Sequence, residues 1–582
     1  MGIGYTIDTP VKVAQYGISS VISLVDDMLM EKMREFYSKK MDLPFQEITD
    51  KIEDFRAKRI SAYLNLIDTI VKAKFEEMKI SLLEKGSELE KCLDLLPRTS
   101  ALKEKFEHMK QHESIRDAIT WLQQNLHAGS IDVNIMTKLD KENYFNNEKL
   151  PAEYNDAHAA LRGFANSNLS SSVVLSAGMS PKLYSYIEKF NDFFPDSSGN
   201  LKKKITLKVS DYRSALVQGK FLAKKGLWVS EYRVESGLNC GGHAFATQGF
   251  LMGPILEEFK NNREVLIQST FEILSQTLKA KGLECPQTHP EIKITAQGGV
   301  GTADEHTFLL NYYDLDSIGW GSPFLLVSEA SSIDENTMQQ LCDAKEDDLF
   351  LSNISPLGVP FNSLRGNTKD VEKQKNIDAG KPGFPCTKRF LVSNTEYTDK
   401  PICTASKQYQ KLKLATLESS NLTPEALFQQ KSSLQAKACI CVGLGTSTLL
   451  INNISTGFDG DGVSICPGPN LAYFSEKATL SEMVGHIYGK NNLIKRTDRP
   501  HMFLKELSMY IDYLDVKLKE AVVEMNEKTL DYLNVFQKNL LEGVEYYKNL
   551  FNNHISPDQI EYIIMQLEKF ENKILQLEFS KA

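Results

Sequence analysis

Apolar positions along this 582-residue chain change their period several times, and each change predicts a different kind of element. From residue 23 to residue 126 the period is helical, with apolar side chains three or four positions apart. One such stripe comprises Ile60, Leu64, Ile67, Val71, Phe75, Met78 and Leu82. We expect a helical insertion or cap here, with this stripe packed into a core.

Short β-rich runs separated by helical stretches fill residues 130–328. A similar run, at Val11 and Val13, precedes the helical block. Strands that alternate with helices imply parallel pairing in a barrel or a doubly wound sheet, and the loops after the strands then form the active face. The expected strands are residues 131–136, 173–176, 205–209, 227–234, 292–296 and 316–319.

The rest of the chain has two regions with different sequence patterns. Residues 331–500 are irregular and hold six of the nine cysteines, five of them after residue 380. Residues 503–551 return to a helical period that resembles a heptad seam, which we expect to pack on the body or on a second subunit as in a homo-oligomer. The seam residues are Leu507, Ile511, Leu514, Leu518, Ala521 and Met525.

Composition narrows the class of protein. The 67 Lys+Arg and 76 Asp+Glu residues give a net charge of −9, which disfavours a nucleic-acid surface because phosphate neutralisation needs a basic patch. The start lacks the regions of a secretory signal, and no stretch approaches about 18 uninterrupted apolar residues. We therefore expect a cytoplasmic protein without a membrane segment, in which sparse cysteines do not form a secreted disulfide framework.

Two glycine-rich segments follow predicted strands near residue 300. They read QGGVG at residues 297–301 and GWGS at residues 319–322. Each leads toward a helix start, so clusters of free backbone N–H groups could bind a phosphate. In a barrel, the loops after strands seven and eight frequently build such a site. The alternative is a pair of glycine turns without a ligand.

A third strand end delivers a histidine to the same face. Residues 227–252 contain a strand followed by Cys240, Gly241, Gly242 and His243. Imidazole titrates nearest neutrality, so His243 could act as acid or base, or donate a hydrogen bond to a bound ring. A structural role for His243 and a packed, neutral thiol at Cys240 are the alternatives.

Five cysteines occur in the irregular region next to Gly or Pro, in turns from which thiolates can converge. Their gaps of 17, 36, 2 and 25 positions match no compact motif. Buried free thiols, an iron–sulfur cluster and a structural zinc site are all compatible with this pattern. The candidate metal ligands are Cys386, Cys403, Cys439, Cys441 and Cys466.

These segments together resemble the nitronate monooxygenase family and its barrel relatives, the flavin-dependent enoyl-acyl-carrier-protein reductases and the enoyl reductase subunit of polyunsaturated-fatty-acid synthases. The resemblance rests on Val234-Glu235 with Gly241-Gly242-His243, then AQGGVGTADE and GWGSPFL, in this order. VNIM (133–136), VVLSAGMSP (173–181) and SPLGVPFNSLRGN (355–367) also fit. It covers about half of the chain.

The resemblance implies an FMN-dependent oxidoreductase on a (β/α)8 TIM barrel. In it, His243 would be the acid, base or substrate-orienting residue, and the cofactor contacts would be Gly17, Asn134, Lys208, Gly241, Gly242, Gly298, Gly299, Gly301, Gly321 and Ser322. Asn134 and Lys208 would lie near the isoalloxazine ring. The phosphate would be bound by Gly298, Gly299, Gly321 and Ser322.

The predicted fold class is therefore α/β, a TIM barrel with an N-terminal helical insertion and a C-terminal, largely helical extension. The predicted parts are the barrel (1–22 and 130–330), the insertion (23–129), a cysteine-bearing extension (331–500) and a helical arm (501–582).

Two reactions fit this class: oxidation of a nitronate, and reduction of an activated double bond in a small organic or acyl substrate. NAD(P)H or an electron-transfer protein would donate electrons, and an iron–sulfur cluster would add one-electron transfer. The alternatives are a non-flavin, phosphate-binding isomerase or lyase and a helical assembly component.

Overall fold

The centre of the molecule is a curled parallel sheet. The computed structural model describes residues 4–81, 83–97, 99–176, 178–521, 527–554 and 557–577. Seven strands pair in the order β1-β2-β5-β6-β7-β8-β9, every pair parallel. All six strands expected between residues 130 and 328 are confirmed. The strands are β1 (Ser20–Ser23), β2 (Ile131–Ile135), β5 (Ser171–Leu175), β6 (Lys203–Val209), β7 (Val229–Glu235), β8 (Lys293–Gln297) and β9 (Ser317–Gly319).

The sheet is a partial barrel, and the complete eight-stranded barrel is not confirmed. In the described residues no ladder joins β9 to β1. The β-rich run that we expected at Val11 and Val13 is wrong, because this segment forms the helix α1 (Thr9–Val13) and the 3-10 turn η1 (Ala14–Tyr16). Pro10 lies in the first helical turn, where its fixed φ and missing N–H favour a helix start.

The segment around α1 links the two open edges of the sheet. It contacts β1 and is bonded to the chain that follows β9. The Thr9 hydroxyl donates to the Ala330 carbonyl at 2.6 Å, and the Ser332 amide donates to the Tyr5 carbonyl at 2.7 Å. These hydrogen bonds lie outside the strand ladder. They stabilise the curled sheet at the position that an eighth strand would occupy in a closed barrel.

Helices cover the outside of the curl. Those that connect successive strands are α7 (Asp156–Ala165), α8 (Pro181–Ile187), α9 (Tyr212–Ala223), α10 (Met252–Ala280) and α11 (Ala303–Tyr312). The expected helical insertion contains α2 (Asp27–Lys40), α3 (Phe55–Ile80), α4 (Glu88–Leu95), α5 (Ala101–His112) and α6 (Ile115–Asn125).

The apolar stripe of the insertion is confirmed as a core face on α3. Ile60, Leu64 and Ile67 are fully buried, and α3 packs on α2 and α7. Leu82, the last position of the predicted stripe, lies outside the described residues. At the start of α3, Arg56 and Arg59 both bind the buried Asp27 carboxylate. Helices α2 and α3 therefore share one core with the sheet, whereas α4, α5 and α6 belong to a second core with the extension.

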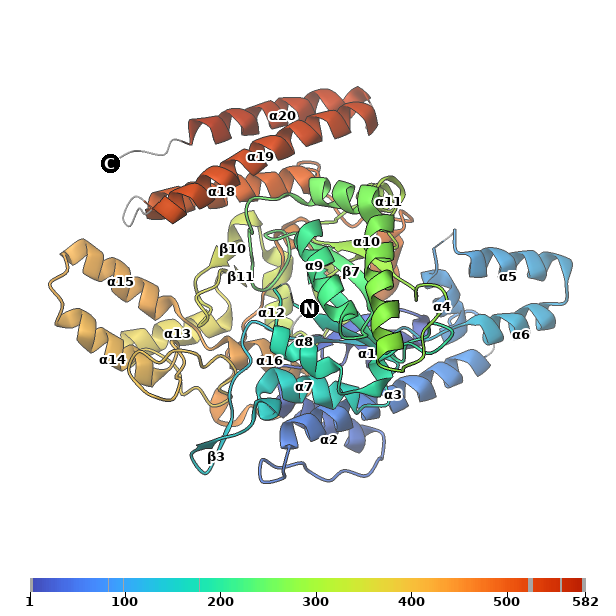
Figure 1. The fold of residues 1–582 in the computed structure, drawn as a ribbon, viewed down its shortest axis with the longest axis horizontal. Coiled ribbons are helices and arrows are strands. Elements are labelled where there is room, and N and C mark those ends of the chain that lie inside the picture. The colour runs from blue at the N-terminus through green and yellow to red at the C-terminus, as the bar shows by residue number, and fades with distance from the viewer. Residues whose placement is uncertain are drawn as a thin grey trace.

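The irregular region after the sheet contains more regular structure than its sequence suggests. Its elements are α12 (Glu335–Asp343), the hairpin β10 (Leu349–Ser352) and β11 (Phe361–Leu364), α13 (Thr368–Asp378), α14 (Lys407–Glu418), α15 (Pro424–Ala436), α16 (Ile440–Ile451) and α17 (Leu480–Ile487). Figure 1 shows α14 and α15 as a projecting pair, opposite the projecting pair α5 and α6.

One helical stretch, Pro424–Ile451, is long and apolar enough to pass a test for a membrane span. Its apolar window is 72% buried inside the protein, as in the core helix of a folded domain. The stretch is moreover interrupted between α15 and α16.

Three C-terminal helices lie together along one side of the molecule (Figure 1). They are α18 (Met502–Ala521), α19 (Glu527–His554) and α20 (Pro557–Gln576). The seam residues Leu507, Ile511 and Leu514 are buried in the same core as the sheet. The predicted packing of this segment on the body is confirmed, whereas Met525 lies outside the described residues.

A buried ion pair joins these helices to the loop after β8. Arg499, just before α18, binds both oxygens of the Glu305 carboxylate, at 2.7 and 2.9 Å. Arg499 also donates to the Gly299 carbonyl at 2.9 Å, and Glu305 accepts from the Gly301 and Met502 amides. Burial would raise the pKa of Glu305, but the attraction of Arg499 holds it below its ordinary value.

Substitution Arg499→Met is expected to lower the free energy of unfolding by about 3–5 kcal/mol, because it leaves a buried carboxylate without its partner. Arg496→Met is the matched control. Arg496 is 38% exposed and pairs with the exposed Asp498, so its loss should cost less than about 1 kcal/mol. Urea unfolding of both variants measures the difference, and equal losses would contradict a structural role for the buried pair.

Candidate active site

A cavity of about 620 Å³ opens at the carboxyl ends of the strands. This is the edge of a parallel sheet at which ligands bind in such folds. Nine of the eleven predicted active-site and cofactor residues line it. They are Asn134, Lys208, Gly241, Gly242, His243, Gly298, Gly299, Gly321 and Ser322.

Gly17 and Gly301 are not among the lining residues, so the cavity does not bring them together with the other nine. Gly17 has φ 80° and ends η1, so its backbone shape accounts for the glycine. The Gly301 amide donates to the Glu305 carboxylate at 2.9 Å. A carboxylate of the protein itself thus occupies the position at which we expected a ligand phosphate.

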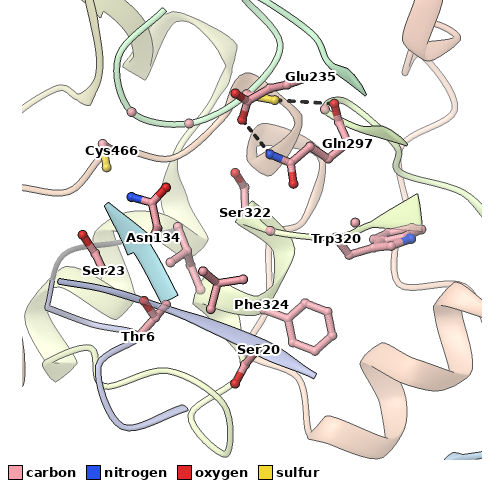
Figure 2. A pocket seen from close by; sticks show the side chains of 18 of the residues that line it. Thr6, Ser20, Ser23, Asn134, Glu235, Gln297, Trp320, Ser322, Phe324 and Cys466 are labelled. Carbon is pink, nitrogen blue, oxygen red and sulfur yellow. Dashed lines mark hydrogen bonds between the residues drawn. The ribbon is translucent and has the colours of Figure 1, made fainter. Parts of the chain in front are cut away.

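Glu235, at the end of β7, is the centre of a charged group on the cavity wall. Its carboxylate is 3.0 Å from the Lys208 ammonium and accepts a hydrogen bond from the Gln297 amide at 2.6 Å. Figure 2 shows the bond between Glu235 and Gln297. Burial would raise the pKa of Glu235, but Lys208 and then Gln297 lower it. The carboxylate is therefore ionised and neutralises Lys208.

Two buried amide oxygens in the cavity wall have no hydrogen-bond partner among the residues that the structure describes. They are Oδ1 of Asn134, near the end of β2, and Oδ1 of Asn239, in the loop after β7. Buried polar atoms are almost always bonded, so these two acceptors mark positions where a donor on a ligand or a water is required. Asn134 points toward the middle of the cavity in Figure 2.

The glycines after β8 are needed for close packing. Gly298 and Gly299 have φ 119° and 81°, values that favour glycine. A Cβ on Gly298 would lie 2.7 Å from the Cys240 sulfur, and one on Gly299 would lie 2.1 Å from the Asn239 amide nitrogen. The loops after β7 and β8 are thus in direct contact.

The second glycine segment, after β9, is more open. A Cβ on Gly321 would meet nothing within 4 Å. The Ser322 hydroxyl accepts from the Gly468 amide at 2.7 Å, which connects this segment to the extension. Helices α16 and α17 of the extension also line the cavity, through Cys441 and Val484. The extension therefore covers the site.

His243 is held firmly and is uncharged. Its Nε2 is 2.7 Å from the Ser355 hydroxyl, and its ring packs at 4.8 Å against the ring of Phe361. Burial, followed by repulsion from Lys138, lowers the pKa of His243 to about 3. At neutral pH this neutral imidazole can donate or accept a hydrogen bond, but it lacks the second proton that a general acid would transfer.

Cys240 is a neutral thiol, the alternative that the sequence left open. Its Sγ donates to the Gln297 carbonyl at 3.6 Å, and burial, followed by repulsion from Glu235, raises its pKa well above the ordinary value. A thiol in this state is a poor nucleophile.

The structure shows where the five candidate cysteines of the extension lie. In the described part of the chain, no group of three or more His, Cys, Asp or Glu side chains is placed to hold a metal ion. Cys466 is bonded to the Tyr5 hydroxyl at 3.0 Å, whereas Cys386 and Cys403 lie in a small separate cluster. Burial raises the pKa of Cys439, Cys441 and Cys466, which keeps these thiols protonated.

A second buried carboxylate supports the loop that carries His243. Glu506, on α18, accepts hydrogen bonds from the Ser236 hydroxyl and from the Met252 amide. The Ser236 hydroxyl accepts in turn from the Asn239 amide at 3.2 Å. Burial raises the pKa of Glu506 to about 7. A helix far along the chain therefore positions the strand-end loop.

Several lining residues were not predicted from the sequence. Lys138 and Gln297 each lie within three residues of a strand end, so a search of all positions just after predicted strands would have found them. Thr6, Leu391 and Glu506 carry no comparable signal, because they reach the site or its supporting loop from distant segments.

Comparisons with known proteins add little to this geometry. No family model matches the chain, and no curated protein matches it. Among solved structures, it is similar to the enoyl reductase domain of MlnA from the macrolactin biosynthesis cluster of Bacillus amyloliquefaciens. The identity is 14% and the TM-score 0.35, over 72% of this chain and 88% of that one. A likeness at this level supports no conclusion about function.

The low pKa of His243 can be measured directly. We expect the ring signals of His243 in NMR spectra to stay constant between about pH 5 and about pH 8, because the imidazole is neutral throughout this range. The variant His243→Gln assigns the signals by their disappearance. An inflection within this range would show that the imidazole gains a proton there and would contradict the role described above.

Glu506 makes stability depend on pH. Its pKa of about 7 in the folded protein exceeds the ordinary value of 4.5, so the unfolded chain releases this proton first. Its contribution is complete below about pH 4.5 and falls by up to about 3 kcal/mol as the pH rises through 7.

Glu506→Gln should remove this part of the pH dependence of the free energy of unfolding, measured in urea at several pH values. Glu520→Gln, an exposed position on the same helix, is the control and should change nothing. If Glu506→Gln kept the full fall in stability, the raised pKa would be refuted.

Proposed function

We propose that this protein is an FMN-dependent oxidoreductase that acts on a small organic or acyl substrate. The observation that carries the proposal is the convergence, in one cavity at the strand ends, of nine residues predicted as flavin or catalytic contacts. The cavity volume of 620 Å³ lies within the range of about 300–1,000 Å³ that is typical of small-molecule and cofactor sites.

The residues present fit a flavin in three respects. The unpartnered Asn134 oxygen would accept the imide N–H of the isoalloxazine ring. Lys208, neutralised in part by Glu235, would lie beside the ring. The phosphate would lie at the open segment of Gly321 and Ser322, just after β9. It would not lie at the Gly301 amide, because that amide already donates to Glu305.

When bound, FMN supplies hydride transfer, and the protein supplies orientation, charge and exclusion of water. His243, fixed by Ser355, would orient a substrate carbonyl or nitro oxygen by a hydrogen bond. Because its pKa is about 3, it would not deliver a proton at neutral pH. Helices α16 and α17 would keep bulk water from the reacting atoms.

FMN binding is the first test. Purified protein titrated with FMN should shift the visible flavin bands and quench flavin fluorescence at saturation. Asn134→Ala should weaken FMN about fivefold to tenfold, because it removes one hydrogen bond to a buried donor. Asn549→Ala, on α19 and away from the cavity, is the matched control. A protein that binds no FMN would overturn the proposal and favour a non-flavin, phosphate-binding enzyme.

A second experiment distinguishes the two candidate reactions. Under anaerobic conditions, NADH or NADPH should bleach the bound flavin, and either a nitronate or an enoyl thioester should restore its colour. Reoxidation by one substrate and not the other assigns the reaction. If neither restores the colour, both reactions are excluded.

A further inference from the structure

Among the described residues, the lysine and arginine side chains that line the cavity are paired with carboxylates, with one exception. Lys208 is paired with Glu235, and Arg233 with Glu231 at 2.7 Å. Lys138 has no carboxylate of the described chain at ion-pair distance, and its ammonium lies 3.6 Å from the centre of the Phe245 ring. Lys138 is therefore the one lining lysine or arginine that is held in place without being neutralised.

Lys138 lies at the exposed mouth of the cavity, next to the residue predicted to be catalytic. It follows β2 by three residues, whereas His243 and Phe245 belong to the loop after β7. Two strand-end loops thus bring a cation, an imidazole and an aromatic ring together. Phe245 is 40% exposed, so part of its ring is available for contact with a ligand.

We infer that Lys138 is the anion-recognition residue of this cavity and binds the carboxylate of a small organic monoanion. The inference deepens the proposed function, on which it rests, by naming the charge of the substrate. The ammonium would bind the oxygens, and Phe245 and Met136 would contact the apolar remainder.

The surroundings of Lys138 favour recruitment of such an anion. Lys208 and Glu235 cancel each other nearby, and His243 is uncharged at neutral pH. Loss of solvation, followed by repulsion from Lys208, lowers the pKa of Lys138, and Glu235 opposes this in part. A bound anion would stabilise the protonated form of Lys138. The affinity of the cavity for the anion should therefore fall as the pH rises and Lys138 loses its proton.

Benzoate and its neutral isostere benzamide are suitable probes for the complete protein, by isothermal titration calorimetry. We expect Lys138→Met to weaken benzoate about tenfold or more and to leave benzamide unchanged, because only benzoate carries the charge. Lys138→Arg should retain most of the benzoate affinity. Wild-type affinity should decrease from about pH 6 to about pH 9, whereas the arginine variant should show no such decrease.

Lys260→Met is the matched control, since Lys260 lies 4.0 Å from the Tyr312 ring centre, outside the cavity. Equal benzoate binding by the wild type and Lys138→Met, or no benzoate binding by the wild type, would overturn the inference.

The same preparations titrated with FMN separate this result from the proposed function. If the protein binds FMN but Lys138→Met binds benzoate as tightly as the wild type does, only the inference about Lys138 is refuted. Benzoate binding that needs Lys138, without FMN binding, refutes the flavin proposal alone.

Discussion

The buried pair of Glu305 and Arg499 is the interaction on which the site most depends. It joins the start of α11, the glycine loop after β8 and the C-terminal helices in one hydrogen-bonded unit. Because both groups are withdrawn from water, neither can be left alone without a large cost. The loop that lines the cavity is therefore fixed by a residue nearly 200 positions away, and the helical arm becomes part of the architecture of the site.

The open sheet explains why so much chain surrounds it. A closed barrel satisfies its own edges, whereas this sheet leaves β9 and β1 apart, and the segment around α1 bonds the regions beside them. The extension then covers the cavity with α16 and α17. Helices α2 and α3 and the C-terminal helices share one core with the sheet, whereas the extension forms a second core with α4, α5 and α6.

Alternation of strands and helices predicted the strands and placed every strand end on one edge, where the cavity lies. The lining residues Asn134 and Lys208 were implied only by the resemblance to a known family. Local patterns failed where tertiary context decides. Val11 and Val13 read as a strand, yet Pro10 and the neighbouring contacts make a helix. Gly301 reads as part of a phosphate loop, but the Glu305 carboxylate occupies its amide. The cysteine pattern left buried thiols, an iron–sulfur cluster and zinc open, because spacing along the chain says nothing of where the sulfurs lie in the fold.

Crystals grown with FMN would show whether the cavity at the strand ends is a flavin site. We expect electron density for a flavin within the cavity, with its imide edge at Asn134 and its phosphate beside Gly321 and Ser322. Density for FMN at another place on the protein, or a cavity closed to FMN at saturating concentration, would contradict this expectation.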